Sequence, residues 1–537
     1  MKKIIILFIV LLSALTTVTA KTYYIAINGN DDTGTGSITE PYATIMKGQT
    51  VAVGGDTVYI RGGSYTMTNS NISAYVTLGP YAVVNNLNKS GSSASKRIYY
   101  WAYPGEKPVF DFSDVKLSGY RVTAFFVTGS YIHLKGLEVT GMQVTITTHT
   151  QSECFRNQGS YNIYENLCMH DGMGIGFYLQ SGSNNLVLNC DAYRNWDNVS
   201  ETKKGSNVDG FGFHPSKGST GNVIRGCRAW FNSDDGYDCI NAYETVVFDN
   251  CQAFYNGYNS SFTSLGDGNG FKAGGYGQAP VVSKLPSPVP SHLVRFCVAY
   301  RNKSNGFYAN HHVEKEILFY NNTAFRNATN YNMLSQKITK SSFTGNDTTL
   351  DCPGIRHKLR NNVSYKYSSY RDTLNIGTSD MLYNSFTPGS GITVNGNDFI
   401  SLDEALLVAP RLADGSLPDT DFLRLQPSSD LIDKGQNIGF AYSGAAPDLG
   451  AFEYQQQTPV DVLPVKSLLF FPDPVSDKLN FTGSSDKNIE IFNCEGKRML
   501  NLKVTYSVDV SNLPAGIYII RIKADDEKPV ISKFIKR

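Results

Sequence analysis

Short segments in the middle of the chain alternate small and large side chains, as half-buried strands do. Four copies share a Cys-x-Ala-aromatic-x-Asn pattern, at residues 189–195, 226–232, 250–256 and 296–302. A further apolar segment precedes each copy or follows the last, at residues 186–188, 223–225, 246–248, 293–295 and 317–319. The closing Asn favours a turn, because it tolerates left-handed geometry and its side chain bonds its own backbone. We expect these asparagines to form a ladder at one corner of a repeated structure.

A third segment follows each closing Asn. Its copies share the pattern Asp/Asn-Gly-aromatic and differ in the fourth residue. Its four copies are Asp209-Gly210-Phe211-Gly212, Asp235-Gly236-Tyr237-Asp238, Asn269-Gly270-Phe271-Lys272 and Asn305-Gly306-Phe307-Tyr308. Three short strands in each repeat, at repeat lengths of roughly 20 to 50 residues, predict an all-β right-handed parallel β-helix. Neighbouring coils of such a helix lie about 4.8 Å apart, so equivalent residues touch. Lys272 should therefore lie beside Asp238 and near three further carboxylates, those of Asp209, Asp234 and Asp235.

The distance between the closing Asn and this phrase differs from repeat to repeat. Asp235 follows Asn232 by three positions, whereas residues 196–208 and 257–268 are insertions in two other repeats. Loops that enter a site in this way commonly carry binding residues. We expect them to wall a cleft, with Lys203 and Lys204 of the first loop as candidate substrate contacts.

The two ends of the chain differ from the repeats. Two lysines, an apolar run at residues 4–15 and small residues at 18–20 predict a cleaved signal peptide over residues 1–20 and no membrane span. Residues 21–454 would form the β-helix, its first strands at 23–25, 54–60 and 99–101 capping the coil end. Residues 455–462 resemble a linker, and alternating positions in 463–537 predict a small β-sandwich-like domain.

Composition narrows the function classes. The 537 residues include 48 Lys+Arg and 47 Asp+Glu, so no overall field favours nucleic acid or an anionic membrane. We expect a monomer. Four of the nine cysteines occupy one repeated slot, which favours stacked free thiols over disulfides in an exported protein.

Four clustered aspartates predict a metal site. Asp209, Asp234, Asp235 and Asp238 are hard oxygen donors of the kind that Ca²⁺ prefers. The sequence around them lacks the glutamate and the flanking helices of an EF-hand. A solvated acidic turn is the alternative, but four unpaired carboxylates would repel one another, and a lysine stands in the same column.

A lysine beside a calcium ion suits β-elimination from a uronic acid polymer. The base removes the C5 proton, and the ion neutralises the adjacent sugar carboxylate. Lys272 would be the base, which predicts an alkaline optimum because a neutral lysine is scarce at neutral pH. Tyr237, Asn269 and His311 are further candidate substrate contacts, whereas an exposed pair formed by His311 and His312 would be an ordinary loop feature.

The motifs around these residues resemble polysaccharide lyase family 9, the β-helical pectate lyases. The matching stretches are residues 207–212, 221–238 and 266–275, and the similarity extends over residues 21–454. By this resemblance the four aspartates would bind calcium and Lys272 would accept the proton. The family also contains rhamnogalacturonan lyases, and the motifs do not separate the two substrates. Pectate is the first choice and rhamnogalacturonan I the alternative. Either substrate would be an acidic polysaccharide of the plant cell wall.

The last domain resembles a type IX secretion sorting domain. The matching phrases are residues 471–477, 513–518 and 533–537, and Asp473 stands where that family usually has asparagine. This resemblance implies a secreted or cell-surface protein.

Two other function classes fit a β-helix. A hydrolase resembling polygalacturonases would use aspartates as acid and base, without calcium or a lysine base. A non-catalytic glycan-binding surface protein would bind galacturonan without shortening it. The ultraviolet absorbance of an unsaturated uronide separates the lyase from both.

Overall fold

The chain folds as two compact units, Met1–Gln455 and Gln456–Arg537. The computed structural model describes residues 19–76, 79–148, 151–201, 203–277, 285–334, 336–340, 347–351, 357–366, 371–374, 380–455, 470–471, 475–481, 486–493, 497–524 and 530–537. The expected signal peptide (1–20) and linker (455–462) lie outside the described residues, apart from Thr19, Ala20 and Gln455. Residues 463–469 and 472–474 of the expected sorting domain, which include Asp473, lie outside them as well.

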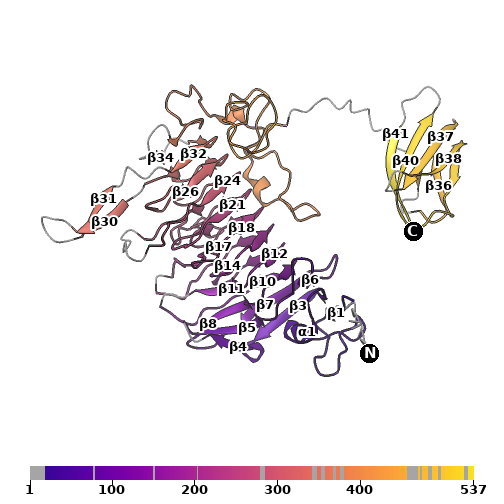
Figure 1. Ribbon diagram of the computed structural model, residues 1–537, viewed down its shortest axis with the longest axis horizontal. Coiled ribbons are helices and arrows are strands. Elements are labelled where there is room, and N and C mark those ends of the chain that lie inside the picture. Colours follow the sequence, from indigo (N-terminus) through magenta and orange to yellow (C-terminus); the bar gives the residue numbers. More distant parts are fainter. Residues whose placement is uncertain are drawn as a thin grey trace, which may run out of the picture. The chain divides into compact units, whose positions relative to one another are not determined.

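Three long sheets form the larger unit, and each turn of the chain adds one strand to each sheet (Figure 1). Sheet A runs in the order β1 (Thr22–Ile25), β2 (Thr57–Ile60), β6 (Ile98–Ala102), β9 (Ile132–Lys135), β12 (Ile163–Glu165), β15 (Leu186–Leu188), β18 (Asn222–Arg225), β21 (Val246–Asp249), β24 (Leu293–Arg295), β27 (Leu318–Tyr320), β32 (Lys358–Arg360). Sheet B runs in the order β3 (Gly63–Thr68), β7 (Pro108–Asp114), β10 (Glu138–Thr140), β13 (Cys168–His170), β16 (Asp191–Tyr193), β19 (Arg228–Trp230), β22 (Gln252–Phe254), β25 (Val298–Tyr300), β28 (Thr323–Phe325), β33 (Val363–Tyr365).

Sheet C completes each coil and carries the repeated Asp/Asn-Gly-aromatic phrase. Its order is β34 (Arg371–Thr373), β29 (Thr329–Asn332), β26 (Asn305–Tyr308), β23 (Phe271–Lys272), β20 (Tyr237–Asp238), β17 (Phe211–Phe213), β14 (Gly174–Leu179), β11 (Ser152–Asn157), β8 (Arg121–Val127), β5 (Tyr81–Leu87), β4 (Ala74–Val76). The strands pair in parallel, except for the edge strand β4, which is antiparallel to β5. This is the expected parallel β-helix.

Short helical elements and a hairpin complete the larger unit. The helix α1 (Ile45–Val51) contacts β1, β2 and β5 at the N-terminal end of the coil, where it covers the open core. Among the described residues, 3₁₀ turns lie at Asn69–Asn71, Gly396–Asp398 and Glu404–Val408. An antiparallel hairpin pairs β30 (Gln336–Lys340) with β31 (Asp347–Asp351). Among the described residues, no helix is long and apolar enough to cross a membrane.

The interior of the solenoid contains a column of stacked aromatic rings from sheet C. Neighbouring rings lie nearly parallel, with centroids 5.1 Å apart for Phe211 and Tyr237 and 4.6 Å apart for Tyr237 and Phe271. Phe271 and Phe307 continue the stack at 5.1 Å. These side chains are fully buried, so each gains both burial of apolar surface and favourable ring contacts.

Asparagines form the expected ladder at the corner between sheets B and C. The side-chain amide of Asn195 donates to Asn232, that of Asn232 to Asn256, and that of Asn256 to Asn302, at 2.9 to 3.1 Å. The left-handed residue at this corner is the one before each asparagine, for example Phe231 with φ 52°. Our assignment of the left-handed turn to the asparagine was therefore wrong, since its buried side chain bonds the next coil instead.

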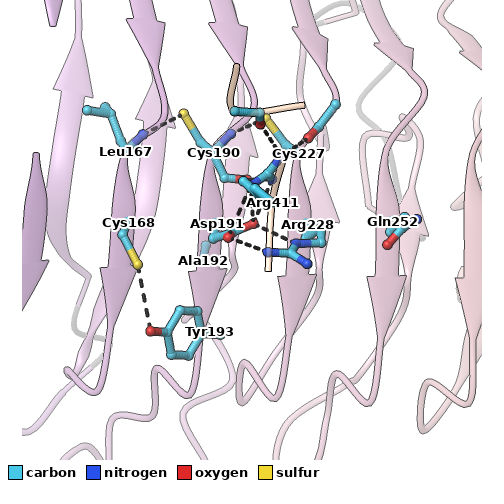
Figure 2. Close-up of polar contacts among 12 residues, drawn as sticks. Leu167, Cys168, Cys190, Asp191, Ala192, Tyr193, Cys227, Arg228, Gln252 and Arg411 are labelled. Atoms are coloured by element: carbon cyan, nitrogen blue, oxygen red, sulfur yellow. Dashed lines mark hydrogen bonds and ion pairs between the residues drawn. The ribbon is translucent and has the colours of Figure 1, made fainter. Parts of the chain in front are cut away.

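A second ladder contains the repeated cysteines (Figure 2). The backbone N–H of Leu167 points at Sγ of Cys190 at 3.4 Å, and that of Cys190 at Sγ of Cys227 at 3.3 Å. Cys168 lies apart from this ladder and contacts the hydroxyl of Tyr193. The cysteines of the described residues are free thiols, as expected.

The segment that follows the last coil, residues 380–455, folds back over the outer face of sheet B. Its apolar side chains share a buried cluster with that face, and include Leu407, Phe422, Leu423, Leu425 and Leu431. Arg411 of this segment reaches between the strands and bonds Asp191 together with Arg228 (Figure 2). The sequence did not predict this covering segment.

The smaller unit is built from antiparallel strands. One sheet pairs β35 (Phe470–Phe471), β36 (Lys478–Phe481) and β39 (Ser507–Asp509). The other pairs β38 (Arg498–Val504), β37 (Lys487–Asn493), β40 (Gly516–Ala524) and β41 (Val530–Lys536). Their inner faces form one apolar core that includes Ile489, Ile491, Ile520 and Phe534. Two antiparallel sheets around one core agree with the expected sandwich-like domain.

Candidate active site

The outward side chains of sheet C form two columns along the solenoid. Strand register places Gly212 beside Asp238 and Asp238 beside Lys272, as the repeated phrase predicts. In the other column, the backbone N–H of Asp235 donates to Oδ1 of Asp209 at 3.2 Å. The residues that differ between copies of the phrase are thus neighbours on the outer face of sheet C.

Lys272 lies between two carboxylates. Its Nζ atom is 3.1 Å from Oδ2 of Asp238 and 3.2 Å from Oδ2 of Asp235, and its side chain is 13% exposed. Burial disfavours the charged ammonium, but the nearby carboxylates outweigh burial and raise the pKa of Lys272 well above its usual value. In the absence of a competing cation, Lys272 is held in its protonated form.

Three aspartates converge beside this lysine. Asp209, Asp234 and Asp235 each place one oxygen within 4.8 Å of the others, and all three are buried. Burial and mutual repulsion raise the pKa of Asp209 and of Asp234 well above their usual values. Burial also raises the pKa of Asp235 to about 6, against the attraction of Lys272. A buried group of hard oxygen atoms that repel one another has the chemistry of a divalent cation site.

The fourth aspartate, Asp238, pairs with Lys272 and also repels the carboxylate of Asp209. Oδ1 of Asp238 accepts the backbone N–H of Ile240 at 2.7 Å, and its Oδ2 faces Lys272. Oδ2 of Asp235 faces the same ammonium but accepts no hydrogen bond. The structure therefore groups three of the four predicted aspartates and pairs the fourth with the lysine.

The two insertions reach the site at the edge where the strands of sheet C begin. The hydroxyl of Ser233 donates to the carbonyl of Gly205, and the N–H of Gly266 donates to Ser233. The N–H of Asp267 donates to Oδ1 of Asp234 at 2.8 Å. Both loops are thus fastened to the strand turn that carries the aspartates.

Lys203 and Lys204 are exposed on the first of these loops, outside the carboxylate cluster. Asn269 is nearly buried, and both its backbone N–H and its side-chain amide donate to Oδ1 of Asp235. The structure therefore makes Asn269 a residue that positions Asp235, and its role as a substrate contact stays a prediction.

Tyr237 is wrong as a substrate contact. Its ring is fully buried between Phe211 and Phe271, and its hydroxyl donates to the backbone of Gln252 inside the coil. Tyr237 occupies a position of β20 whose side chain points into the coil, so its ring belongs to the core.

The two histidines are also buried, which corrects the expectation of an exposed pair. His311 is 6% exposed, packs against Tyr308 with centroids 5.7 Å apart, and has its pKa lowered by burial. Nδ1 of His312 accepts the backbone N–H of Gly275 at 3.1 Å, so this ring supports the turn after Lys272.

Sequence reasoning missed two earlier copies of the phrase. The copy Ile175-Gly176-Phe177-Tyr178 in β14 pairs with the copy in β17 that ends at Gly212. The copy Glu153-Cys154-Phe155-Arg156 in β11 pairs with the copy in β14. Tyr178 thereby enters the column of Lys272, and Tyr308 occupies the same column on the other side. The signal that reveals Tyr178 is the phrase Gly-Phe-Tyr, which recurs at residues 306–308.

Another group of ligand-type side chains lies on the outer face of sheet B. Glu138, Cys168 and His170 could converge on an ion. The ring of His170 already bonds Glu138 at 3.0 Å and Asp171 at 2.6 Å. These contacts satisfy both ring nitrogens, unlike the mutually repelling aspartates of sheet C.

Comparison with known proteins agrees with this architecture. Residues 23–357 match the family model described as Pel9A-like, right handed beta helix region, and residues 469–537 match the secretion system C-terminal sorting domain. The chain is 36% identical over 442 residues to pectate lyase L of Dickeya chrysanthemi, covering 81% of this chain and 91% of that protein. It is 30% identical over 455 residues to pectate lyase L of Paenibacillus polymyxa, covering 80% and 86%.

Two solved structures are similar over most of the chain. A rhamnogalacturonan lyase is 45% identical, with a TM-score of 0.70, covering 76% of this chain and 97% of that one. The pectate lyase Pel9A is 33% identical, with a TM-score of 0.63, covering 81% and 97%. These findings confirm the resemblance to polysaccharide lyase family 9. The chain therefore belongs to the Pel9A-like right-handed β-helix family and is a polysaccharide lyase with a C-terminal secretion sorting domain.

Proposed function

We propose that this lyase cleaves the galacturonate-containing backbone of pectin by calcium-dependent β-elimination, with Lys272 as the base. The observation that carries the proposal is the position of the Lys272 ammonium, 3.1 Å from Asp238 and 3.2 Å from Asp235, beside three convergent buried carboxylates. A lysine base next to a divalent cation site is the arrangement that elimination from a uronate requires.

The donor set fits calcium. Asp209, Asp234 and Asp235 offer convergent carboxylate oxygens, and Asp238 is close enough to Lys272 to exchange that partner for a cation. When bound, Ca²⁺ would neutralise the substrate carboxylate and stabilise the negative charge that develops during elimination. Oδ2 of Asp235 faces Lys272 but accepts no hydrogen bond, so it is an acceptor that a cation would satisfy.

Lys272 has to lose its own proton before it can accept one. The amine then takes the proton from C5 of the galacturonate, the C5–H electrons form the C4–C5 double bond, and the C4–O bond breaks. The leaving glycosidic oxygen takes a proton from solvent. Because the carboxylates favour the charged ammonium, the free enzyme gains neutral amine as the pH rises, which supports an alkaline optimum.

Two polymers carry a galacturonate at the cleaved bond. The sequence motifs do not separate them; pectate is the first candidate, which the 36% identity to pectate lyase L of Dickeya chrysanthemi supports. The greater likeness to a rhamnogalacturonan lyase, at 45% identity and a TM-score of 0.70, favours rhamnogalacturonan I as the second. In both cases the substrate is an acidic polysaccharide.

We also propose that the protein is a monomer exported through a cleaved signal peptide over residues 1–20. The secretion sorting domain at residues 469–537 supports export to the cell surface or the medium. Residues 21–454 would then act on a polymer that cannot enter the cell, and residues 455–462 would link them to the sorting domain at 463–537.

One experiment tests the reaction. Wild type, Lys272→Ala and the control Lys135→Ala are assayed on polygalacturonate and rhamnogalacturonan, with calcium and with a chelator. Lys135 is a suitable control because it also pairs with a carboxylate, at 2.7 Å from Glu165, but on sheet A. We expect wild type and Lys135→Ala to form unsaturated product when calcium is present and not when the chelator is present. Full activity of Lys272→Ala, or a saturated product, would overturn the proposal.

A further inference from the structure

Three ligand-type side chains lie together on the outer face of sheet B. Cys168 and His170 lie two positions apart in β13, so strand alternation places both on one face. Register sets Glu138 of β10, on the neighbouring coil, directly beside Cys168. One oxygen, one sulfur and one ring nitrogen of these residues all lie within 4.8 Å of one another. The three side chains are partly exposed, so an ion and a water molecule can reach them from solvent.

These distances suit a tetrahedral zinc ion. Bonds of about 2.0 Å from zinc to nitrogen or oxygen, and of about 2.3 Å to sulfur, place the ligand atoms about 3.3 to 3.6 Å apart. Nε2 of His170 is hydrogen-bonded to Oε1 of Glu138 at 3.0 Å. A cation would take the place of the proton in this bond, and the two atoms would have to separate by only about 0.3 Å.

The ring of His170 is already oriented as zinc-binding histidines are. Its Nδ1 atom bonds Oδ2 of Asp171 at 2.6 Å, and Nε of Arg194 donates to Oδ1 of the same carboxylate at 2.7 Å. The ring also stacks on Tyr193, with centroids 4.7 Å apart and planes 3° apart. A histidine that binds zinc usually donates its other ring N–H to a carboxylate, which fixes the ring and makes it a better ligand. In His170, Nδ1 therefore keeps its partner while Nε2 can exchange Glu138's proton-linked contact for a metal bond.

The thiol decides which ion suits the cluster. Cys168 lies apart from the cysteine ladder, and its Sγ atom donates to the hydroxyl of Tyr193 at 3.7 Å (Figure 2). When the thiol loses its proton to solvent, the thiolate can accept a hydrogen bond from that hydroxyl instead. Thiolate and imidazole ligands favour zinc, whereas calcium prefers oxygen ligands. The cluster on sheet B therefore differs in metal preference from the aspartates of sheet C.

A similar pair on sheet A shows what the third residue contributes. Nε2 of His133 bonds Oε2 of Glu165 at 2.9 Å, but Nζ of Lys135 also lies 2.7 Å from Oε1 of Glu165. The ammonium compensates that carboxylate and would repel a second cation. The third residue beside His170 is a thiol, which becomes an anion when it binds a metal. The two histidine–glutamate pairs should therefore differ in their affinity for zinc.

We propose that Glu138, Cys168 and His170 bind a zinc ion, with solvent as the fourth ligand, and that this ion fastens two neighbouring coils on the outer face of sheet B. The site is separate from the candidate active site on sheet C, and the inference does not depend on the proposed reaction. Asp191 follows Cys168 in the same column and is bonded by Arg228 and Arg411. Zinc would thus extend the cross-links of this face toward the N-terminal coils.

The test measures binding of zinc and of cobalt(II) to the full chain in excess calcium, which occupies sites made of oxygen ligands. Titration calorimetry gives the zinc affinity, and cobalt reports a bound thiolate through a charge-transfer absorption band. Cys168→Ser and His170→Gln should each weaken zinc binding by more than about 100-fold, and Cys168→Ser should also remove the cobalt band. Asp171→Asn removes only the outer partner of His170 and should weaken zinc binding about tenfold.

Three controls separate this site from other places where zinc could bind. His133→Gln removes the matched histidine of sheet A, and Asp234→Asn removes one aspartate of sheet C. The double variant Cys352→Ser with Cys494→Ser removes two cysteines that lie outside the described residues. All three should keep both the zinc affinity and the cobalt band.

Melting curves complete the test. With a chelator they show whether each variant is folded, and zinc should raise the melting temperature of wild type but not that of Cys168→Ser or His170→Gln. The inference is overturned if wild type binds no zinc in excess calcium, if cobalt binds without a thiolate band, or if Cys168→Ser and His170→Gln bind zinc as tightly as wild type. Lyase activity enters none of these measurements, so the proposed reaction can fail while the zinc site stands.

Discussion

The Nζ atom of Lys272 lies 3.1 Å from Oδ2 of Asp238, on the neighbouring strand and at the paired position. One coil thus supplies the proposed base and the previous coil supplies the charge that keeps it protonated. The ammonium also compensates the carboxylates of Asp235 and Asp238, which would otherwise face one another in a buried space.

Lys272→Met should abolish lyase activity and also destabilise the metal-free protein. Removing a buried ammonium leaves Asp235 and Asp238 without their cation, at a cost of about 3 kcal/mol of the free energy of unfolding. Calcium should restore most of this loss, because it replaces the missing charge. Chemical denaturation with calcium and with a chelator measures the difference. The control Lys135→Met, whose side chain is 40% exposed, should cost less than about 1 kcal/mol. Equal metal-free stability of wild type and Lys272→Met would contradict this account.

Asp235→Asn should stabilise the metal-free protein at pH 7. The pKa of Asp235 is raised from 3.8 to about 6, so the folded state binds more protons than the unfolded chain between these values. The free energy of unfolding therefore falls as the pH rises through this window, by roughly 3 kcal/mol for this group. The amide carries no charge and removes the penalty, so variant and wild type should converge near pH 4.

Asp191→Asn is the opposite control for this pH series. The Asp191 carboxyl is buried against Arg228 and Arg411, which hold its pKa below the usual value despite burial. Its stabilising contribution is present above the ordinary pKa of Asp and is lost as the pH falls through its own lowered pKa. This variant should therefore be less stable than wild type at pH 7. If both substitutions shift the unfolding free energy in the same direction, the assigned charge states are wrong.

Asn256→Ala should destabilise the solenoid in the middle of the ladder. The Asn256 amide donates to Ala229 and Asn302, and its oxygen accepts from the backbone and side chain of Asn232. Alanine leaves these buried groups without partners, at a cost of about 3 kcal/mol. Thermal unfolding measures the loss. Asn437→Ala removes one exposed bond to Gly439 and should change the melting temperature little. If Asn256→Ala melted at the same temperature as wild type, the ladder would contribute no stability.

The sequence alone predicts the coil and its columns. Side chains alternate between the two faces of a strand, and neighbouring coils lie one strand spacing apart, so equivalent residues of a repeated phrase lie next to one another. Lys272 beside Asp238 follows from this logic alone. The same parity, applied to Tyr237, would have placed that ring inside with Phe211 and Phe271. Tyr178 was missed because its copy of the phrase begins with Ile175 in place of Asp or Asn, although its register is the same.

Other features depend on contacts that no local pattern encodes. The left-handed residue at the corner, such as Phe231, precedes the asparagine because the amide is needed to reach the next coil. His311 is buried because it packs on Tyr308 after a turn whose course the sequence does not reveal. Residues 380–455 show no repeat, so their return over sheet B could not be predicted.

Arg411→Ala should loosen the segment that covers sheet B. The Arg411 guanidinium bonds Asp191 at 2.6 Å and donates to the carbonyls of Cys190 and Gly226, so one side chain ties this segment to two coils. Its loss leaves Arg228 as the partner of Asp191 and exposes the apolar cluster under the segment more often.

We expect trypsin to cleave the segment in Arg411→Ala at least tenfold faster than in wild type, while the coil itself stays intact on the gel. The matched control is Arg424→Ala in the same segment, because the partner of Arg424, Asp419, is 75% exposed and the pair contributes little. Each variant lacks one trypsin site, so the remaining lysine and arginine sites are compared between them. If the two variants are digested at the same rate, Arg411 does not fasten the segment, and burial of leucines such as Leu407 and Leu431 is sufficient to hold it.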